Sequence, residues 1–238
     1  MLRILLLATL SIAAVLVGCG GGSSKKDATP ARTTASSTAA ASASPAKDET
    51  QFAKSMLLQL ADFPTGWVLA NSSQVNEDSP LDQFCGTSTE DGRTGRAVTG
   101  DFAPKVGAAS VSETVIVFPD ADTAMSSLDK VPDRIACAIK AINDGKLDQP
   151  SVKFSKAESR EANVAAPGDK HYAYQIRMNA AGLDPAATDT TTVYFLLVYA
   201  TKGRVGYSLT GTSTGQPYDT GEMTTAAKNA AAKLKQQP

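Results

Sequence analysis

The chain has 238 residues, of which 42% are hydrophobic and 20% charged, and its formal net charge is −1. This length fits one domain or two small ones, and the composition excludes a wholly disordered chain and a disulfide-dense miniprotein. General nucleic-acid binding needs a basic surface that displaces counterions, so the near-neutral charge argues against a nucleic-acid partner.

The N-terminus has the pattern of an export signal. One positive charge, Arg3, precedes an almost wholly apolar run over residues 4–17, and Cys19 follows directly after Gly18. The run is short for a membrane span and suits the hydrophobic region of a signal peptide. Its end resembles the lipobox of bacterial lipoproteins, whose cysteine receives a diacylglyceryl group and becomes the mature N-terminus. This resemblance implies cleavage after residue 18 and a membrane-lipid anchor on Cys19; an ordinary secretory signal or an uncleaved anchor are the alternatives.

Residues 19–50 are predicted to be a tether. From residue 20 onward they are mainly Gly, Ser, Thr, Ala and Pro, with no aromatic residue and no Val, Leu, Ile or Met. Such a segment cannot bury enough apolar surface to offset the entropy lost on ordering. We therefore expect a disordered tether spanning roughly 30 Å, which could carry O-glycosylation. It would hold a globular domain, residues 51–238, outside the cytoplasm and away from the membrane.

The first half of the domain is predicted to begin with a short amphipathic helix carrying Phe52, Leu57, Leu58 and Leu60. A turn at residues 63–66, a strand from Trp67 and a long polar loop over residues 72–95 follow. Residues 108–118 form a strand that ends apolar on both faces, which predicts a central strand covered on two sides. Two helices come next, the first opened by Asp120 and the second by Pro132.

The second half repeats this style with longer strands. Residues 152–155 predict a short strand, and residues 170–178 alternate between an apolar face and a polar face bearing His171, Gln175 and Arg177. A strand over 191–201 and a strand over 204–211 are expected to form a hairpin at Gly203, and a helix covers 219–235. We predict an α+β domain with a largely antiparallel β-sheet and packed helices.

Cys85 and Cys137 remain if Cys19 carries lipid. An oxidising compartment favours a disulfide between them, worth about 4 kcal/mol by loop-closure entropy. Helical geometry turns Cys137 about 200° from Ile135, away from the apolar stripe of its helix. Two free thiols or a metal site are the alternatives, but two cysteines and one histidine make a poor zinc set. No metal and no cofactor are expected.

Two short motifs resemble the extracellular sensor domains attached to actinobacterial Ser/Thr kinases and related stand-alone lipoproteins. They are Phe84-Cys85-Gly86 and the segment from Phe118-Pro119-Asp120 through Cys137. Members of that family often carry two disulfides, whereas this chain can form only one beside a lipidated Cys19. The resemblance implies a binding or sensing role for an unspecified envelope ligand or protein.

Trp67 and His171 are the candidate ligand contacts. Trp67 follows a Phe-Pro-Thr-Gly turn, so it is either packed in that turn or serves as an aromatic platform for a sugar or an apolar ligand. His171 lies on the polar face of its strand, as a solvated surface residue or as a ligand-contacting, pH-sensitive group.

Catalytic patterns are weak. Residues 211–215 match G-x-S-x-G, but a nucleophile elbow needs a helix directly after it and a later histidine. Pro217 interrupts any such helix, and His171 precedes Ser213, so a Ser/Thr/Gly-rich turn is the better interpretation. The acids Glu77, Asp78, Asp82, Glu90 and Asp91 lack the spacing of an EF-hand and are expected to be solvated.

The sequence therefore predicts a non-enzymatic, membrane-anchored lipoprotein whose domain binds a ligand or a partner. A lipid or glycolipid carrier is the alternative and would need a large apolar cavity. An envelope hydrolase is the least favoured reading.

Overall fold

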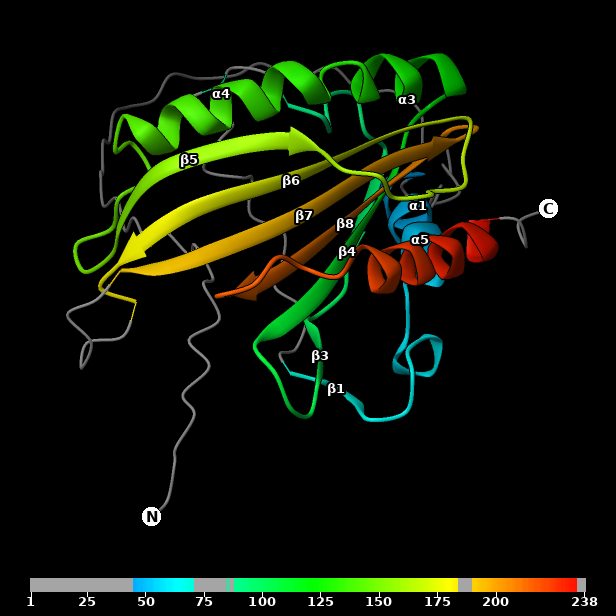
Figure 1. The fold of residues 1–238 in the computed structure, drawn as a ribbon. Coiled ribbons are helices and arrows are strands. Elements are labelled where there is room, and N and C mark those ends of the chain that lie inside the picture. The colour runs from blue at the N-terminus through cyan, green and yellow to red at the C-terminus, as the bar shows by residue number, and fades with distance from the viewer. Residues whose placement is uncertain (1–44, 71–84, 86–87, 184–189, 235–238) are drawn as a thin grey trace, which may run out of the picture.

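The computed structural model describes residues 45–70, 85, 88–183 and 190–234. The predicted signal segment, Cys19 and the first part of the predicted tether lie outside these residues. An eight-stranded sheet organises the domain in the order β1-β3-β4-β8-β7-β6-β5, with β2 paired to β4. Neighbouring strands pair antiparallel and helices pack on both faces (Figure 1). The predicted α+β class with a largely antiparallel sheet is confirmed.

The strands are β1 (Trp67–Leu69), β2 (Gly95–Val98), β3 (Phe102–Pro104), β4 (Ala109–Val117), β5 (Lys153–Glu161), β6 (Lys170–Ala181), β7 (Thr191–Lys202) and β8 (Val205–Thr214). The helices are α1 (Pro45–Ser55), the 3-10 helix η1 (Leu60–Asp62), α3 (Ala121–Leu128), α4 (Val131–Asn143) and α5 (Thr220–Leu234).

Two helical layers enclose the sheet. On one face, which we call the α5 face, α1 and α5 cover an apolar core that includes Val115, Leu196 and Leu209. On the opposite face, which we call the α4 face, α3 and α4 pack on β5, β6 and β7 through residues such as Ile135 and Ile176. β4 contributes to cores on both faces, as predicted for a central strand.

The starts of α3 and α4 and the hairpin between β7 and β8 lie at the residues that the sequence indicates. Asp120 caps α3, and its side chain accepts a hydrogen bond from the Thr123 backbone amide at 2.7 Å. Pro132 lies in the first turn of α4, where its missing amide hydrogen costs nothing. Gly203 has a φ of 55° between β7 and β8, a conformation that glycine adopts without strain.

The domain extends upstream of its predicted start. α1 begins at Pro45, so the last residues of the predicted tether are helical, and Glu49 forms an ion pair with Arg204 at 2.9 Å. The predicted helix through Leu60 is also wrong, because α1 ends at Ser55. There the backbone amide of Leu58 donates to the Glu113 carboxylate at 2.6 Å instead of to a helix carbonyl.

Strand β5 is longer than the predicted segment 152–155, and strands β2 and β3 were not predicted. β5 contains a β-bulge between Ser155 and Glu158, with Lys156 at a φ of 52°. The Asn143 side chain of α4 holds the bulge by bonding both the amide and the carbonyl of Ala157, at 2.8 and 2.9 Å. The bulge interrupts the alternation of inward and outward residues along β5, so a period-two pattern in the sequence does not reveal this charged strand.

Candidate ligand-binding site

Trp67 lines a groove of about 320 Å³ between the start of β1 and the start of α5. We call it the aromatic groove. Its apolar lining includes Phe63, Trp67, Val111, Tyr218 and Ala226, and its acidic lining is Asp62, Asp219 and Glu222. An apolar hollow with a few polar groups at its edge is the usual form of a small-molecule site.

The Phe-Pro-Thr-Gly turn places Trp67 in this groove. Gly66 has a φ of 100°, and the Trp67 amide donates to the Pro64 carbonyl at 3.3 Å, which closes the turn. The Phe63 ring lies 4.9 Å from the Trp67 ring and 4.5 Å from the Phe102 ring, measured between centroids. Phe102 is buried, whereas Trp67 is half-buried. The row of rings therefore packs Trp67 against the turn, as one of the two predicted interpretations has it, and leaves part of the Trp67 side chain on the groove.

Polar contacts tie the same wall of the groove to α5. Asp62 forms an ion pair with Lys233 at 2.9 Å, and its carbonyl accepts a hydrogen bond from the Asn229 side chain at 2.7 Å. Asp62 also accepts from the Gln59 amide at 2.6 Å. These contacts fix the distance between the aromatic wall and the helix.

The acids around the groove differ in their surroundings. Asp219 accepts hydrogen bonds from the Gly221 and Glu222 amides at the start of α5. Partial burial, together with the charge of Asp219, raises the pKa of Glu222 above its ordinary value. On β4, two residues after Val111 of the groove, burial of Glu113 raises its pKa to about 8 against the lowering effect of the Leu58 amide. Tyr218 is 3% exposed, and burial raises its pKa as well.

His171 is not brought to the groove. It is exposed on β6 and lies opposite Ala200 of β7, whereas Trp67 belongs to the strand at the far edge of the sheet. The two candidate contacts therefore cannot form one site.

Ser213 lies inside β8 rather than on an elbow. Its hydroxyl donates to the Gln216 carbonyl at 2.7 Å, and only 7% of the residue is exposed. Ser213 lies opposite Tyr194 and His171 lies opposite Ala200, so the two are separated by roughly 20 Å of strand length. They do not form a nucleophile–base pair.

The remaining predicted residues are placed as follows. Cys85 and Cys137 form a disulfide with Cα atoms 5.8 Å apart, in agreement with the predicted pairing. Glu90 forms ion pairs with Arg93 and Arg96, and Asp91 with Lys130. Glu77, Asp78 and Asp82 lie outside the described residues. In the part of the chain that the structure describes, no group of three or more His, Cys, Asp or Glu side chains could hold a metal.

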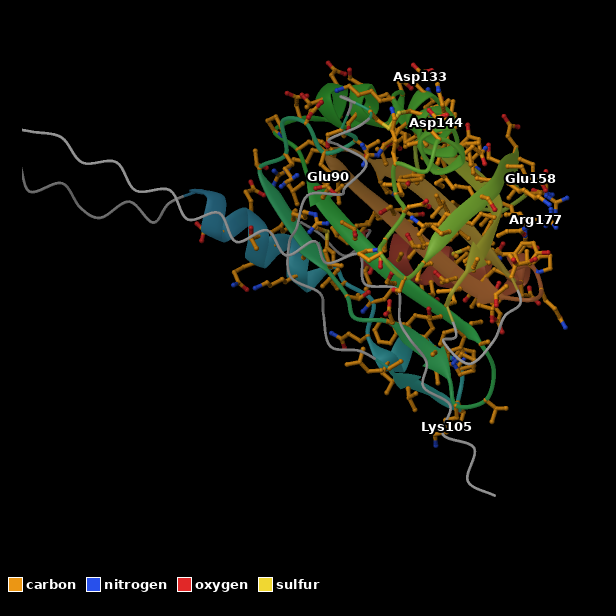
Figure 2. The ribbon with its side chains drawn as sticks, turned by 90° about the vertical axis from the view of Figure 1, so that its left-hand side faces the viewer. Glu90, Lys105, Asp133, Asp144, Glu158 and Arg177 are labelled. Atoms are coloured by element: carbon orange, nitrogen blue, oxygen red, sulfur yellow. A yellow bond between two sulfur atoms is a disulfide. The ribbon has the colours of Figure 1, made fainter. Side chains whose placement is uncertain are left out.

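A second hollow, of about 380 Å³, opens on the α5 face over β5, β6 and β7, and sequence reasoning missed it. We call it the arginine hollow; its lining includes Glu158, Arg160, Gln175, Arg177, Tyr194 and Pro217. Figure 2 shows Glu158 and Arg177 beside each other. Gln175, predicted on a polar face, is only 7% exposed, because the Arg160 side chain packs against it through a hydrogen bond. The sequence signal that could have indicated this hollow is the polar face of β6, on which Gln175 lies between His171 and Arg177.

No family model matches this chain, and no curated protein matches its sequence. Among solved structures it is similar to the extracellular domain of PknH from Mycobacterium tuberculosis, at a TM-score of 0.42 and 13% sequence identity. That match covers 79% of this chain and 97% of the other. So distant a likeness supports no inference about activity. Within the described residues, no helix is long and apolar enough to cross a membrane.

Proposed function

We propose that this protein is a lipid-anchored, extracytoplasmic binding protein, without catalytic activity, whose domain takes its ligand in the aromatic groove. The observation that carries the proposal is the half-buried Trp67 ring, which stacks on Phe63 with ring centroids 4.9 Å apart and lines a groove of about 320 Å³. A rigid aromatic wall offers apolar contact area at low cost in conformational entropy.

The groove's charges narrow the ligand class. Glu222 and Asp219 stand at its edge, and Asp62 is neutralised by Lys233. Carboxylates repel anions and accept hydrogen bonds from hydroxyl groups. We therefore propose a neutral, hydroxyl-bearing ligand with an apolar face, such as a sugar joined to an alkyl chain.

Binding can be followed through the protein's own fluorescence, because Trp67 is the sole tryptophan. The chain from residue 19 onward, carrying Cys19→Ser and lacking the apolar segment 4–17, is purified without detergent and titrated with a series of alkyl glucosides. We expect a saturable change in Trp67 emission. By calorimetry, Trp67→Ala should abolish the binding, while Tyr172→Ala, a change at another half-buried aromatic residue, leaves it intact. Equal binding by both variants, or no saturable signal, contradicts the proposal.

The anchor is tested separately. Wild-type protein should sediment with the membrane fraction and carry the mass of its acyl chains, because several chains give stable anchoring. A chain that begins at residue 19 and carries Cys19→Ser has neither the acyl chains nor the apolar segment 4–17, and it should stay in the soluble fraction. Wild-type protein that sediments without acyl mass would point to an uncleaved signal segment instead. The alternative function, a lipid carrier, is tested by native mass spectrometry of the soluble form after incubation with an envelope extract. A carrier should retain one lipid molecule per chain.

A further inference from the structure

The arginine hollow is a built feature of the sheet, and it is distinct from the aromatic groove. Both lie on the α5 face, on either side of the connection from β8 to α5: Pro217 lines the arginine hollow, and the next residue, Tyr218, lines the aromatic groove. α5 begins only at Thr220 and covers the part of this face nearer β8 (Figure 1).

The β5 bulge places the charged residues in the hollow. Ser155 pairs with Asn179 and Glu158 with Arg177, so β5 uses one residue more than β6 between these pairs. The extra residue turns Glu158 and Arg160 to the α5 face, where Arg177 and Gln175 lie opposite them. Regular pairing would have placed Ala157 and Ser159 there.

The Arg160 guanidinium is held in place by Gln175. The Arg160 Nε donates to the Gln175 side-chain oxygen at 2.8 Å, and Arg160 Nη2 contacts the same oxygen. Only 7% of Gln175 is exposed, so the position of this acceptor is fixed by the surrounding packing. Arg177 lies opposite Tyr194 in the sheet and forms an ion pair with Glu158. Arg160 and Arg177 are diagonal neighbours across β5 and β6, within reach of one ligand group between them.

The charge in the hollow is unbalanced. Two arginines face one acid, Glu158, and Arg177 reaches it through a single contact of 3.3 Å. The Glu158 side chain is 66% exposed and that of Arg177 45% exposed. Such a surface pair is weak and can be displaced by a competing anion. Guanidinium groups match the planar oxygens of carboxylates and phosphates, and Tyr194 and Pro217 add an apolar wall.

We propose that the arginine hollow is an oxyanion-binding site. It takes a phosphate or carboxylate group between Arg160 and Arg177, in competition with Glu158, and holds the adjoining part of the ligand against Tyr194 and Pro217. A free metabolite or a lipid headgroup can supply this chemistry.

The test uses the chain from residue 19 onward with Cys19→Ser, which lacks the apolar segment 4–17, and two probes: glycerol phosphate in calorimetric titration, and phosphatidylcholine vesicles with or without phosphatidylglycerol in sedimentation. Arg177→Gln should weaken binding about tenfold or more, since it removes a charge-assisted contact. Glu158→Gln should strengthen binding by about threefold, because it removes the competing carboxylate. Lys153→Gln is the matched control: it removes one positive charge from the same strand outside the hollow, and binding should not change.

Binding of glycerol phosphate identifies a free ligand, and binding only to the anionic vesicles identifies a headgroup; either supports the site. Absence of both overturns it. Equal weakening by Arg177→Gln and Lys153→Gln also overturns it, since the effect would then be that of overall surface charge. A gain in Glu158→Gln cannot come from misfolding, and Trp67→Ala should leave oxyanion binding unchanged. Failure here is therefore distinct from failure of the aromatic groove.

Discussion

Replacement of Glu113 by glutamine should change how the stability of this protein depends on pH. Glu113 is 2% exposed on β4, within the core of the α5 face, and its carboxylate accepts the Leu58 amide at 2.6 Å. Burial raises its pKa from 4.5 to about 8. The carboxyl group is therefore mostly protonated in the folded protein at neutral pH, whereas in the unfolded chain it is ionised.

The sign of the effect follows from proton binding. Between pH 4.5 and about 8 the folded state holds a proton that the unfolded chain has released, so stability falls as pH rises. The slope is about 1.4 kcal/mol per pH unit at its steepest. Integrated from pH 5 to pH 7, Glu113 alone removes about 2 to 3 kcal/mol of stability. Glutamine cannot ionise, and its side-chain oxygen can still accept the Leu58 amide.

Urea unfolding at pH 5, 6, 7 and 8, followed by Trp67 emission, measures this directly. Glu113→Gln should lie within about 1 kcal/mol of wild type at pH 5 and become the more stable protein as pH rises. Glu158→Gln removes an acid that is 66% exposed, and it should keep the wild-type slope. Parallel pH curves for wild type and Glu113→Gln would refute the reasoning, because they would mean that the folded protein already holds Glu113 ionised.

Three further predictions concern the docking of α1, the disulfide and the core. Gly95→Ala should undock α1 and cost about 1 to 3 kcal/mol, because a Cβ there would lie 2.5 Å from the Glu49 backbone; hydrogen exchange confined to α1 would report it, and unchanged protection would contradict it. Reduction should raise the intact mass by about two hydrogens, and Cys137→Ser should cost about 4 kcal/mol in urea unfolding; an unaltered mass would exclude the disulfide. Leu196→Ala, in the fully buried centre of β7, should cost about 2 to 5 kcal/mol, and a smaller loss would mean that the core collapses around the cavity.

The long elements of this fold could be predicted from the sequence because their signals are local. β4, β6, β7 and β8 each have nine or more residues, enough for apolar periodicity to emerge. The α3 and α4 starts depend on Asp120 and Pro132, which act within one helical turn. β2 and β3 have four and three residues, so their pairing with β4 decides their conformation. α1 similarly depends on Gly95, which lies far along the chain.

The aromatic groove was half predictable. Trp67 stood out as a single large ring after a turn, but its opposite wall comes from α5, and no local pattern joins the two. Asp62 and Lys233 make that junction across most of the domain's length. Sequence reasoning could therefore single out Trp67 but not the groove that Trp67 lines.

The arginine hollow depends on register, and register here is set by a residue on another element. Phe154 and Ala157 both belong to the core of the α4 face although they are three positions apart along the strand, an odd spacing that regular alternation would send to opposite faces. Continued alternation from Phe154 would have turned Glu158 and Arg160 beneath α4, where burying two charges is strongly unfavourable. The bulge held by Asn143 resolves this conflict: it keeps Ala157 in the core and sends both charges to the open face, opposite Arg177 and Gln175. An odd spacing of apolar residues in a charged strand is thus the sequence signal for a bulge of this kind. Which residues the bulge brings together on the open face can be inferred only once the partner strand is known.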